Sequence, residues 1–159
     1  MKILLIEDHK LLSEGLKNSL IKYKDIEKVD TIDGPTNIEH IVSLISINLY
    51  DLILVDINIK KIIDIDGLKL SQLILEKNKE MKIVILTGYD FYALEKEAKE
   101  LGTSGFLYKE INIDLLYSKI KDVMLGKKLF KIKEDKYTDL TDKEREVVNL
   151  YSKGMSRNE

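Results

Sequence analysis

Five polar side chains come directly after short apolar runs, and their types suit chemistry on an anionic group. They are Glu7, Asp8, Asp56, Thr87 and Lys109. Three carboxylates placed together repel one another, so they need a cation. Oxygen ligands without His or Cys favour a hard ion, and Mg²⁺ is the natural candidate. A carboxylate, an ammonium and a hydroxyl would then remain to handle a phosphoryl group.

The apolar runs before these residues predict buried strands. Short runs rich in Ile and Val, bounded by polar residues, are typical of strands that are covered on both faces. The strongest runs are residues 3–6, 52–55 and 83–86, and weaker ones are 29–32 and 105–108. The sequence therefore predicts strands that helices must cover from both sides.

Segments with helical periodicity lie between the runs. Apolar residues recur three or four positions apart within residues 12–23, 38–45, 70–74 and 113–124. Thr36 and Glu39 form a capping-box pattern that predicts the start of the second helix. The charged run 95–100 is typical of a solvated helix face, unless that face meets a partner. Alternating strands and helices indicate an α/β fold with a doubly wound, five-stranded parallel sheet.

The five polar side chains are expected to meet at one edge of this sheet. In doubly wound folds, ligands bind outside the carboxyl ends of the strands, where all five residues fall. A single acidic residue after a strand is more often a solvated turn or a helix cap. That alternative does not account for the whole set.

The set of Glu7 and Asp8, Asp56, Thr87 with Gly88, and Lys109 resembles the receiver domain of bacterial two-component response regulators. The resemblance covers residues 1–126 and implies a flavodoxin-like sheet of strand order 2-1-3-4-5. It implies that Asp56 accepts a phosphoryl group from a sensor histidine kinase, as a carboxylate nucleophile. It further implies a phosphoprotein that catalyses its own phosphoryl transfer and slow dephosphorylation and is not otherwise an enzyme. A cytoplasmic location is expected because the apolar run at the start of the chain is too short for a signal peptide.

The resemblance also implies a Mg²⁺ site and a switch. Asp8 would be the main metal ligand beside Asp56, Glu7 would support the ion through water, and the backbone carbonyl of Asn58 would complete the protein ligands. Lys109 would neutralise the phosphoryl oxygens, and Thr87 would bind the phosphoryl group and act as the switch.

Phe106 occupies the position of the family's switch aromatic, and its alternative role is core packing. The loop after Asp56 departs from the family, because Gly67 comes later than usual and the stretch from Asp56 to Gly67 contains no Pro. The loop is also apolar, with isoleucines at 57, 59, 62, 63 and 65. We expect it to alter the access of water to the phosphoryl group, and so its lifetime.

The C-terminal part has its own resemblance. Residues 127–137 are predicted to form a solvated linker, and residues 138–159 resemble the start of a LuxR-type helix-turn-helix domain of the NarL/FixJ class. The residues that carry this resemblance are Leu140, Thr141, Glu144, Glu146, Val147, Leu150, Gly154, Ser156 and Glu159. The alternative is an amphipathic helix that packs on the first domain.

This second resemblance implies control of transcription, with DNA bound by the full-length output domain. The DNA-reading helix is missing, so the length looks like a cut and this fragment should not bind DNA specifically. Both arginines, Arg145 and Arg157, lie in this region. A homodimer that forms on phosphorylation is left open.

Composition excludes several classes of protein and of site. The chain has 159 residues, a formal charge of −2 and no Cys, which excludes disulfides and thiolate chemistry. No apolar run is long enough to span a membrane. We expect His9 in a loop and His40 on a helix surface.

Two other functions stay open. One is a Mg²⁺-dependent phosphohydrolase with Asp56 as nucleophile, although Asn58 stands where such enzymes usually carry a second Asp. The other is a receiver-like interaction module that is not phosphorylated.

Overall fold

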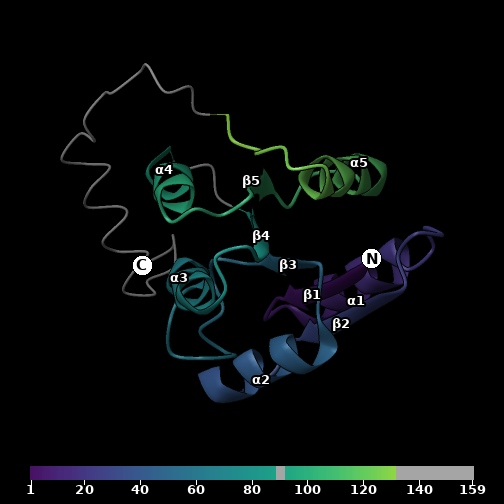
Figure 1. Ribbon diagram of the computed structural model, residues 1–159. Coiled ribbons are helices and arrows are strands. Elements are labelled where there is room, and N and C mark those ends of the chain that lie inside the picture. Colours follow the sequence, from purple (N-terminus) through teal and green to yellow (C-terminus); the bar gives the residue numbers. More distant parts are fainter. Residues whose placement is uncertain (89–91, 132–159) are drawn as a thin grey trace.

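Five parallel strands form one sheet in the order β2-β1-β3-β4-β5 (Figure 1). The computed structural model describes residues 1–88 and 92–131. The strands are β1 (Lys2–Ile6), β2 (Lys28–Ile32), β3 (Leu52–Val55), β4 (Lys82–Thr87) and β5 (Gly105–Tyr108). The predicted α/β class, the strand order and all five strand positions are confirmed.

Helices cover both faces of the sheet. They are α1 (Lys10–Leu20), α2 (Ile38–Asn48), α3 (Gly67–Lys77), α4 (Tyr92–Glu100) and α5 (Ile113–Met124). Helices α1 and α5 lie on one face, and α2, α3 and α4 lie on the other (Figure 1). No helix within the described ranges is both long and apolar enough to cross a membrane.

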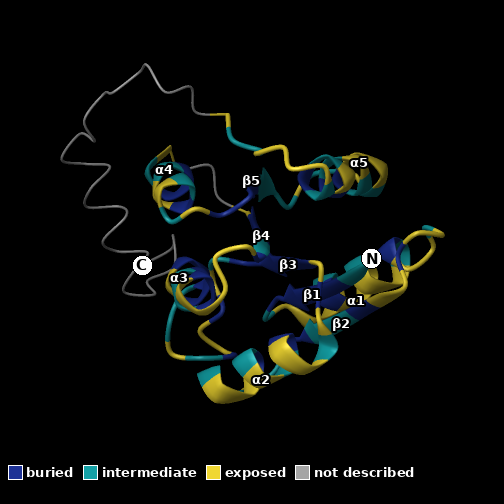
Figure 2. Ribbon diagram, in the orientation of Figure 1, coloured by how far each residue is buried: buried dark blue, intermediate teal, exposed yellow. Residues whose placement is uncertain are grey.

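Successive residues of each strand point to opposite faces and feed two separate cores. In β1, Leu4 and Ile6 pack with α2, α3 and α4, whereas Ile3 and Leu5 pack with α1 and α5. All four are at most 1% exposed. Figure 2 shows the buried strands between helices whose outer faces are exposed. The continuous apolar runs of the sequence follow from this double burial.

Helix starts are fixed by side-chain caps, and one predicted cap is wrong. The second helix is capped by Asn37, whose Oδ1 accepts the His40 N–H at 2.8 Å, and not by Thr36. The Thr36 N–H instead donates to the Ile62 carbonyl at 2.8 Å, which holds Thr36 outside the helix. As predicted, His9 lies in the loop before α1 and His40 is exposed on α2; His9 also caps α1, which was not predicted.

The long loop between β3 and α3 is folded into the core. Ile59 and Ile62 are at most 2% exposed and pack among the residues facing α2, α3 and α4. Ile57, Ile63 and Ile65 pack against the same core. The apolar side chains of the loop therefore add to the core, and the loop is anchored to the start of α2 through Ile62 and Thr36.

The chain after α5 returns to the sheet, so the expected solvated linker is wrong for Leu129 and Phe130. Leu129 pairs in parallel with Gly105 of β5. The Leu129 side chain is partly buried against the core that faces α1 and α5, and the Phe130 side chain against the core on the other face. The solvated helix face is also wrong at Glu95, which is 4% exposed and accepts a hydrogen bond from the Lys131 N–H. The rest of the linker, from residue 132, and residues 138–159 lie outside the described residues.

Candidate functional site

Three carboxylates meet at the carboxyl ends of β1 and β3. These strands are neighbours, and the Asp56 N–H donates to the Ile6 carbonyl at 2.9 Å, which places Asp56 beside Glu7 and Asp8. One oxygen from each carboxylate lies within 4.8 Å of the others. Glu7 and Asp56 are buried, and Asp8 is half-buried. The predicted convergence of these side chains is present.

Lys109 reaches this cluster from the end of β5. Its Nζ lies 2.6 Å from Glu7 Oε2 and 2.8 Å from Asp56 Oδ2. Its backbone N–H donates to the Thr87 carbonyl at 2.8 Å, which joins the ends of β4 and β5. The second oxygen of Glu7 accepts the His9 N–H at 3.0 Å. Glu7 is therefore held from two sides.

Burial and charge act in opposite directions at this site. Burial raises the pKa of Asp56 to about 6, with Glu7 adding to the rise, while Lys109 and a hydrogen bond from the Asn58 backbone lower it. Burial lowers the pKa of Lys109, but the Asp56 and Glu7 carboxylates outweigh it, so the pKa of Lys109 is raised. Lys109 is thus held as a cation between two anions.

The donor set fits a divalent cation. Three carboxylates face one ammonium in the part of the chain that the structure describes, so negative charge remains uncompensated. All candidate ligands are oxygens, and the half-buried Asp8 leaves one side accessible. This is the ligand chemistry that Mg²⁺ prefers, with few carboxylates and space left for water and phosphate oxygens.

The other predicted residues lie close to the cluster or behind it. Thr87 is fully buried at the end of β4, in register with Tyr108 of β5. Asn58 is exposed just beyond Asp56. Phe106 is 2% exposed within the core, and its ring meets Tyr108 edge-on at 6.0 Å between centroids. The core-packing role of Phe106 is therefore present; a switch role stays a prediction.

Gly67 lies against the backbone of Asp56. A Cβ at Gly67 would lie 2.0 Å from the Asp56 carbonyl oxygen, closer than any real contact. The Gly67 N–H also donates to the Ile57 carbonyl at 2.8 Å. The start of α3 thus supports the backbone that carries Asp56, and this support needs a residue without a side chain.

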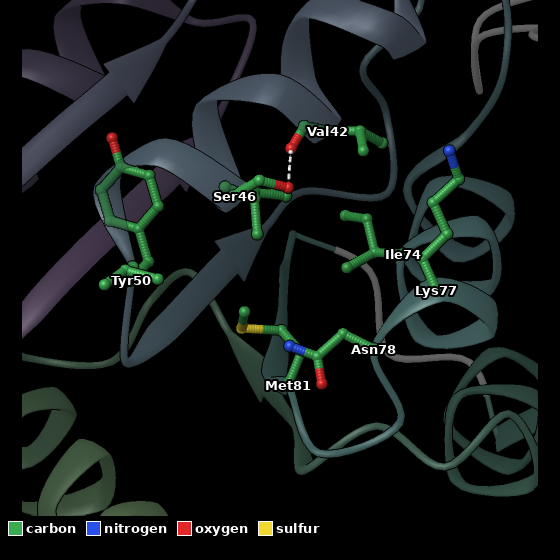
Figure 3. A pocket seen from close by; sticks show the side chains of 9 residues that line it. Val42, Ser46, Tyr50, Ile74, Lys77, Asn78 and Met81 are labelled. Carbon is green, nitrogen blue, oxygen red and sulfur yellow. Dashed lines mark hydrogen bonds between the residues drawn. The ribbon is translucent and has the colours of Figure 1, made fainter.

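Away from the carboxylate site, a hollow lies between the C-terminal ends of α2 and α3. It encloses about 270 Å³, below the roughly 300–1,000 Å³ of small-molecule sites. Val42 and Ser46 line one side, and Ile74 and Lys77 line the other (Figure 3). The Ser46 hydroxyl already donates to the Val42 carbonyl at 2.9 Å. This hollow contributes nothing to the carboxylate site, which lies at the other end of the strands.

Comparison with known proteins accounts for the arrangement. The profile of the response regulator receiver domain matches residues 3–121. The chain belongs to this family. The receiver fold explains why the polar residues lie at strand ends, because the sheet brings those ends together at one edge.

Relatives of the receiver domain include named transcriptional regulators. DegU of Brevibacillus brevis is 31% identical over 127 residues, and ComA of Bacillus subtilis is 32% identical over 125 residues. Each alignment covers 79% of this chain but only 51% of DegU and 56% of ComA. The chain thus spans about half the length of these relatives. The response regulator UvrY of Escherichia coli K12 is 24% identical over 174 aligned positions, covering 100% of this chain and 77% of UvrY.

Solved structures share the fold. A two-component response regulator from Clostridium difficile has a TM-score of 0.65 at 29% identity, over 79% of this chain and 96% of that one. A LuxR-family response regulator from Aurantimonas has a TM-score of 0.67 at 20% identity, over 81% of this chain and 88% of that one. At 20% identity, the second match shows the fold alone.

Two features of the site escaped sequence reasoning. The ion pair between Lys109 and Glu7 was not predicted, because the ammonium that follows β5 reaches the carboxylate that follows β1 only across the folded sheet. The contact of Gly67 with Asp56 was also missed. An Asp-Gly pair before the third helix was its only signal.

Proposed function

We propose that this receiver domain accepts a phosphoryl group on Asp56 in a Mg²⁺-dependent reaction. The observation that carries the proposal is the nearly buried Asp56 carboxylate, in contact with Lys109 and beside two further carboxylates. An Asp56 oxygen would attack the phosphorus of a phosphohistidine. The P–N bond would break, and its electron pair would return to the imidazole, which is then protonated.

Each neighbouring residue has a role in this proposal. Asp8, Glu7, Asp56 and the backbone carbonyl of Asn58 would hold Mg²⁺, which supplies positive charge to the phosphoryl oxygens when bound. Lys109 would exchange part of its contact with Glu7 and Asp56 for the phosphoryl oxygens. The Thr87 hydroxyl would donate a hydrogen bond to the phosphoryl group. Positioning and charge neutralisation are what phosphoryl transfer mainly requires.

The relatives support a proposal about the wider role of the chain. We propose a receiver over residues 1–126, a linker over 127–137 and the beginning of a LuxR-type output domain over 138–159. A sensor histidine kinase would be the phosphodonor, and the full-length output domain would bind DNA and control transcription. The names of DegU and ComA as transcriptional regulatory proteins support this role. Slow self-dephosphorylation would return the domain to its starting state.

Incubation with phosphoramidate and Mg²⁺, followed by intact mass spectrometry, tests the acceptor. The wild-type chain should gain one phosphoryl adduct, and Asp56→Asn should gain none. Asp64→Asn is the matched control, because Asp64 is an exposed carboxylate on the loop after β3. An adduct on Asp56→Asn, or none on the wild type, would contradict the proposal.

The phosphohydrolase alternative predicts a different observation. A hydrolase would release phosphate from small phosphate esters continuously, whereas a receiver would release at most what it had stored. We expect no steady-state release, because Asn58 cannot serve as the general acid that protonates the leaving alcohol.

A further inference from the structure

The long loop between β3 and α3 is held by its own backbone at two points. Near its start, the Ile57 carbonyl accepts the Gly67 N–H at 2.8 Å. Two residues later, the Ile59 carbonyl accepts the N–H groups of Ile62 and Ile63, at 2.8 and 3.0 Å, which closes a turn. The first part of the loop is therefore fixed on both sides of residue 58.

The side chain of Ile59 adds an anchor in the core. It is fully buried and packs in the core that faces α2, α3 and α4. Its neighbours in the chain, Asn58 and Lys60, are both exposed. Ile59 is thus the first residue of the loop whose side chain is completely enclosed, and its backbone cannot move without disturbing the core.

Asn58 lies between these two fixed residues, and its backbone is next to the acceptor. Its N–H donates to the Asp56 carboxylate. Its carbonyl accepts no backbone N–H from residues 1–88 or 92–131, whereas the carbonyls of Ile57 and Ile59 on either side do. The Asn58 carbonyl shares a planar peptide group with the Ile59 nitrogen, so the position of Ile59 orients it.

A neutral oxygen at this position suits the charge of the site. The carboxylate oxygens of Glu7, Asp8 and Asp56 lie within 4.8 Å of one another and repel one another. A carbonyl adds an oxygen ligand without adding charge. Mg²⁺ requires nearly ideal octahedral geometry, so a misplaced carbonyl would bind it poorly, whereas Ca²⁺ tolerates flexible geometry.

We propose that Ile59 is a positioning residue of the acceptor site, whose buried side chain holds the Asn58 carbonyl in place as a ligand for Mg²⁺. The inference rests on the proposed function, because the Asn58 carbonyl belongs to the Mg²⁺ site proposed there. Ordering a loop costs conformational entropy. In this loop the cost arises when the domain folds, so it does not arise again when the metal binds.

The alternative is that Ile59 only fills space in the core. Ile41 separates the two roles, because it is also fully buried in the same core but belongs to α2 and not to the loop. Alanine at either position removes the same atoms from the same core. Only the loss of the Ile59 side chain should also release the Asn58 peptide group.

Amide NMR spectra of the 159-residue chain, recorded during titration with Mg²⁺, measure the difference. Ile59→Ala should bind Mg²⁺ about tenfold more weakly than the wild type, since changes that disturb the support of metal ligands typically cost about 10–100-fold in affinity. Ile41→Ala should keep the wild-type affinity. Titration with Ca²⁺ should show a smaller loss for Ile59→Ala, because Ca²⁺ tolerates a displaced ligand.

The same spectra show whether each variant is folded. Where alanine unfolds the domain, the valine variants give the same comparison, and Ile59→Val should bind Mg²⁺ more weakly than Ile41→Val. Adduct formation with phosphoramidate is a second readout. For Ile59→Ala, the Mg²⁺ concentration at half-maximal rate should rise with the dissociation constant, while the rate at saturating Mg²⁺ stays near that of the wild type.

Equal Mg²⁺ affinities of the matched Ile59 and Ile41 variants, with an adduct on Asp56 of the wild type, would overturn the inference and leave the proposed function intact. Weaker Mg²⁺ binding by the Ile59 variant, with no adduct on wild-type Asp56, would refute the proposed acceptor and support the positioning role. A wild type that does not bind Mg²⁺ would refute both.

Discussion

Lys109 is the residue on which the electrostatics of the site depends. Its side chain is 19% exposed, and its ammonium compensates the carboxylates of Glu7 and Asp56, whose side chains are at most 5% exposed. Water screens neither carboxylate well, so loss of the ammonium leaves buried charge without a partner. The same ammonium is available to phosphoryl oxygens, so one side chain serves both stability and the proposed chemistry.

Lys109→Met should destabilise the metal-free domain by about 3 kcal/mol, because breaking a buried ion pair leaves the remaining carboxylates buried without a partner. Urea denaturation with a chelator present measures this. Mg²⁺ should raise the midpoint of the variant more than that of the wild type, since the ion replaces the lost positive charge.

Lys127→Met is the control for the removal of a lysine. Lys127 pairs with Asp122 at 2.6 Å on the exposed surface, so its loss should leave the midpoint close to the wild type. If Lys109→Met had the same urea midpoint as Lys127→Met, Lys109 would not be needed to compensate the buried carboxylates, and the role assigned to it would be wrong.

Asp56→Asn should stabilise the metal-free domain at pH 8 by about 1–3 kcal/mol, because one pKa unit corresponds to about 1.4 kcal/mol. Folding raises the pKa of Asp56 from 3.8 to about 6, so its ionisation works against the folded state. The stability of the wild type relative to Asp56→Asn is therefore greatest below pH 3.8 and is lost as the pH rises through 6.

Thermal or urea denaturation of both proteins from pH 4 to pH 8, with a chelator, measures this difference. The advantage of the variant should shrink as the pH falls from 6 toward 4. A constant difference across the range would show that Asp56 has an ordinary pKa in the folded domain.

At the scale of elements, the acceptor is held by the parts of the chain on either side of it. The hydrogen bond to Ile6 fixes Asp56 to β1, and Gly67 at the start of α3 lies against its carbonyl. The loop between them is anchored by Ile59 and Ile62 in the core. The departure of this loop from the family's usual length is thus absorbed without moving Asp56 away from Glu7.

Gly67→Ala should destabilise the domain by about 1–3 kcal/mol and slow the phosphorylation of Asp56. The added Cβ must displace either α3 or the Asp56 backbone, which it would otherwise approach to 2.0 Å. Denaturation and the rate of adduct formation measure the two effects. Gly15→Ala, in α1, should stabilise the domain slightly, because alanine favours a helix more than glycine does. If Gly67→Ala and Gly15→Ala had the same free energy of unfolding and the same rate of adduct formation, the steric role of Gly67 would be refuted.

At the scale of the whole molecule, the sheet separates two cores but joins them into one folding unit. Ile41 of α2 and Ile120 of α5 are both fully buried, on opposite faces. They share no core cluster, so we expect their contributions to add. The strands contribute to both cores, so unfolding of either face should expose the other.

Ile41→Val and Ile120→Val should each lower the free energy of unfolding by about 0.5–1.5 kcal/mol. The double variant should show their sum within about 0.5 kcal/mol, in one cooperative transition. Urea denaturation followed by circular dichroism and by tyrosine fluorescence tests this. Two separate transitions would contradict the single folding unit. A large departure from the sum would contradict the independence of the two core contributions.

Much of this architecture could be predicted because it rests on local patterns. Buried strands such as β3 need continuous apolar residues, and helices such as α5 need apolar residues at helical spacing, so both appear in the sequence. The cap of α2 could not be assigned, because Thr36 and Asn37 are both suitable and a bond to Ile62 decides between them. The hydrogen bond that the buried Glu95 accepts comes from Lys131, far along the chain, which no local pattern reveals.

The sequence by itself determined the fold class and the types of side chain at the strand ends, because periodicity and residue chemistry are local properties. Only the tertiary structure decided which of these side chains touch. Lys109 directly follows β5 and Glu7 directly follows β1, and their contact exists because β3 and β4 set the distance that a lysine side chain must span. The docking of Leu129 on Gly105 is likewise a meeting of two backbones, whose hydrogen-bonding groups are the same in every residue and so leave little trace in the sequence.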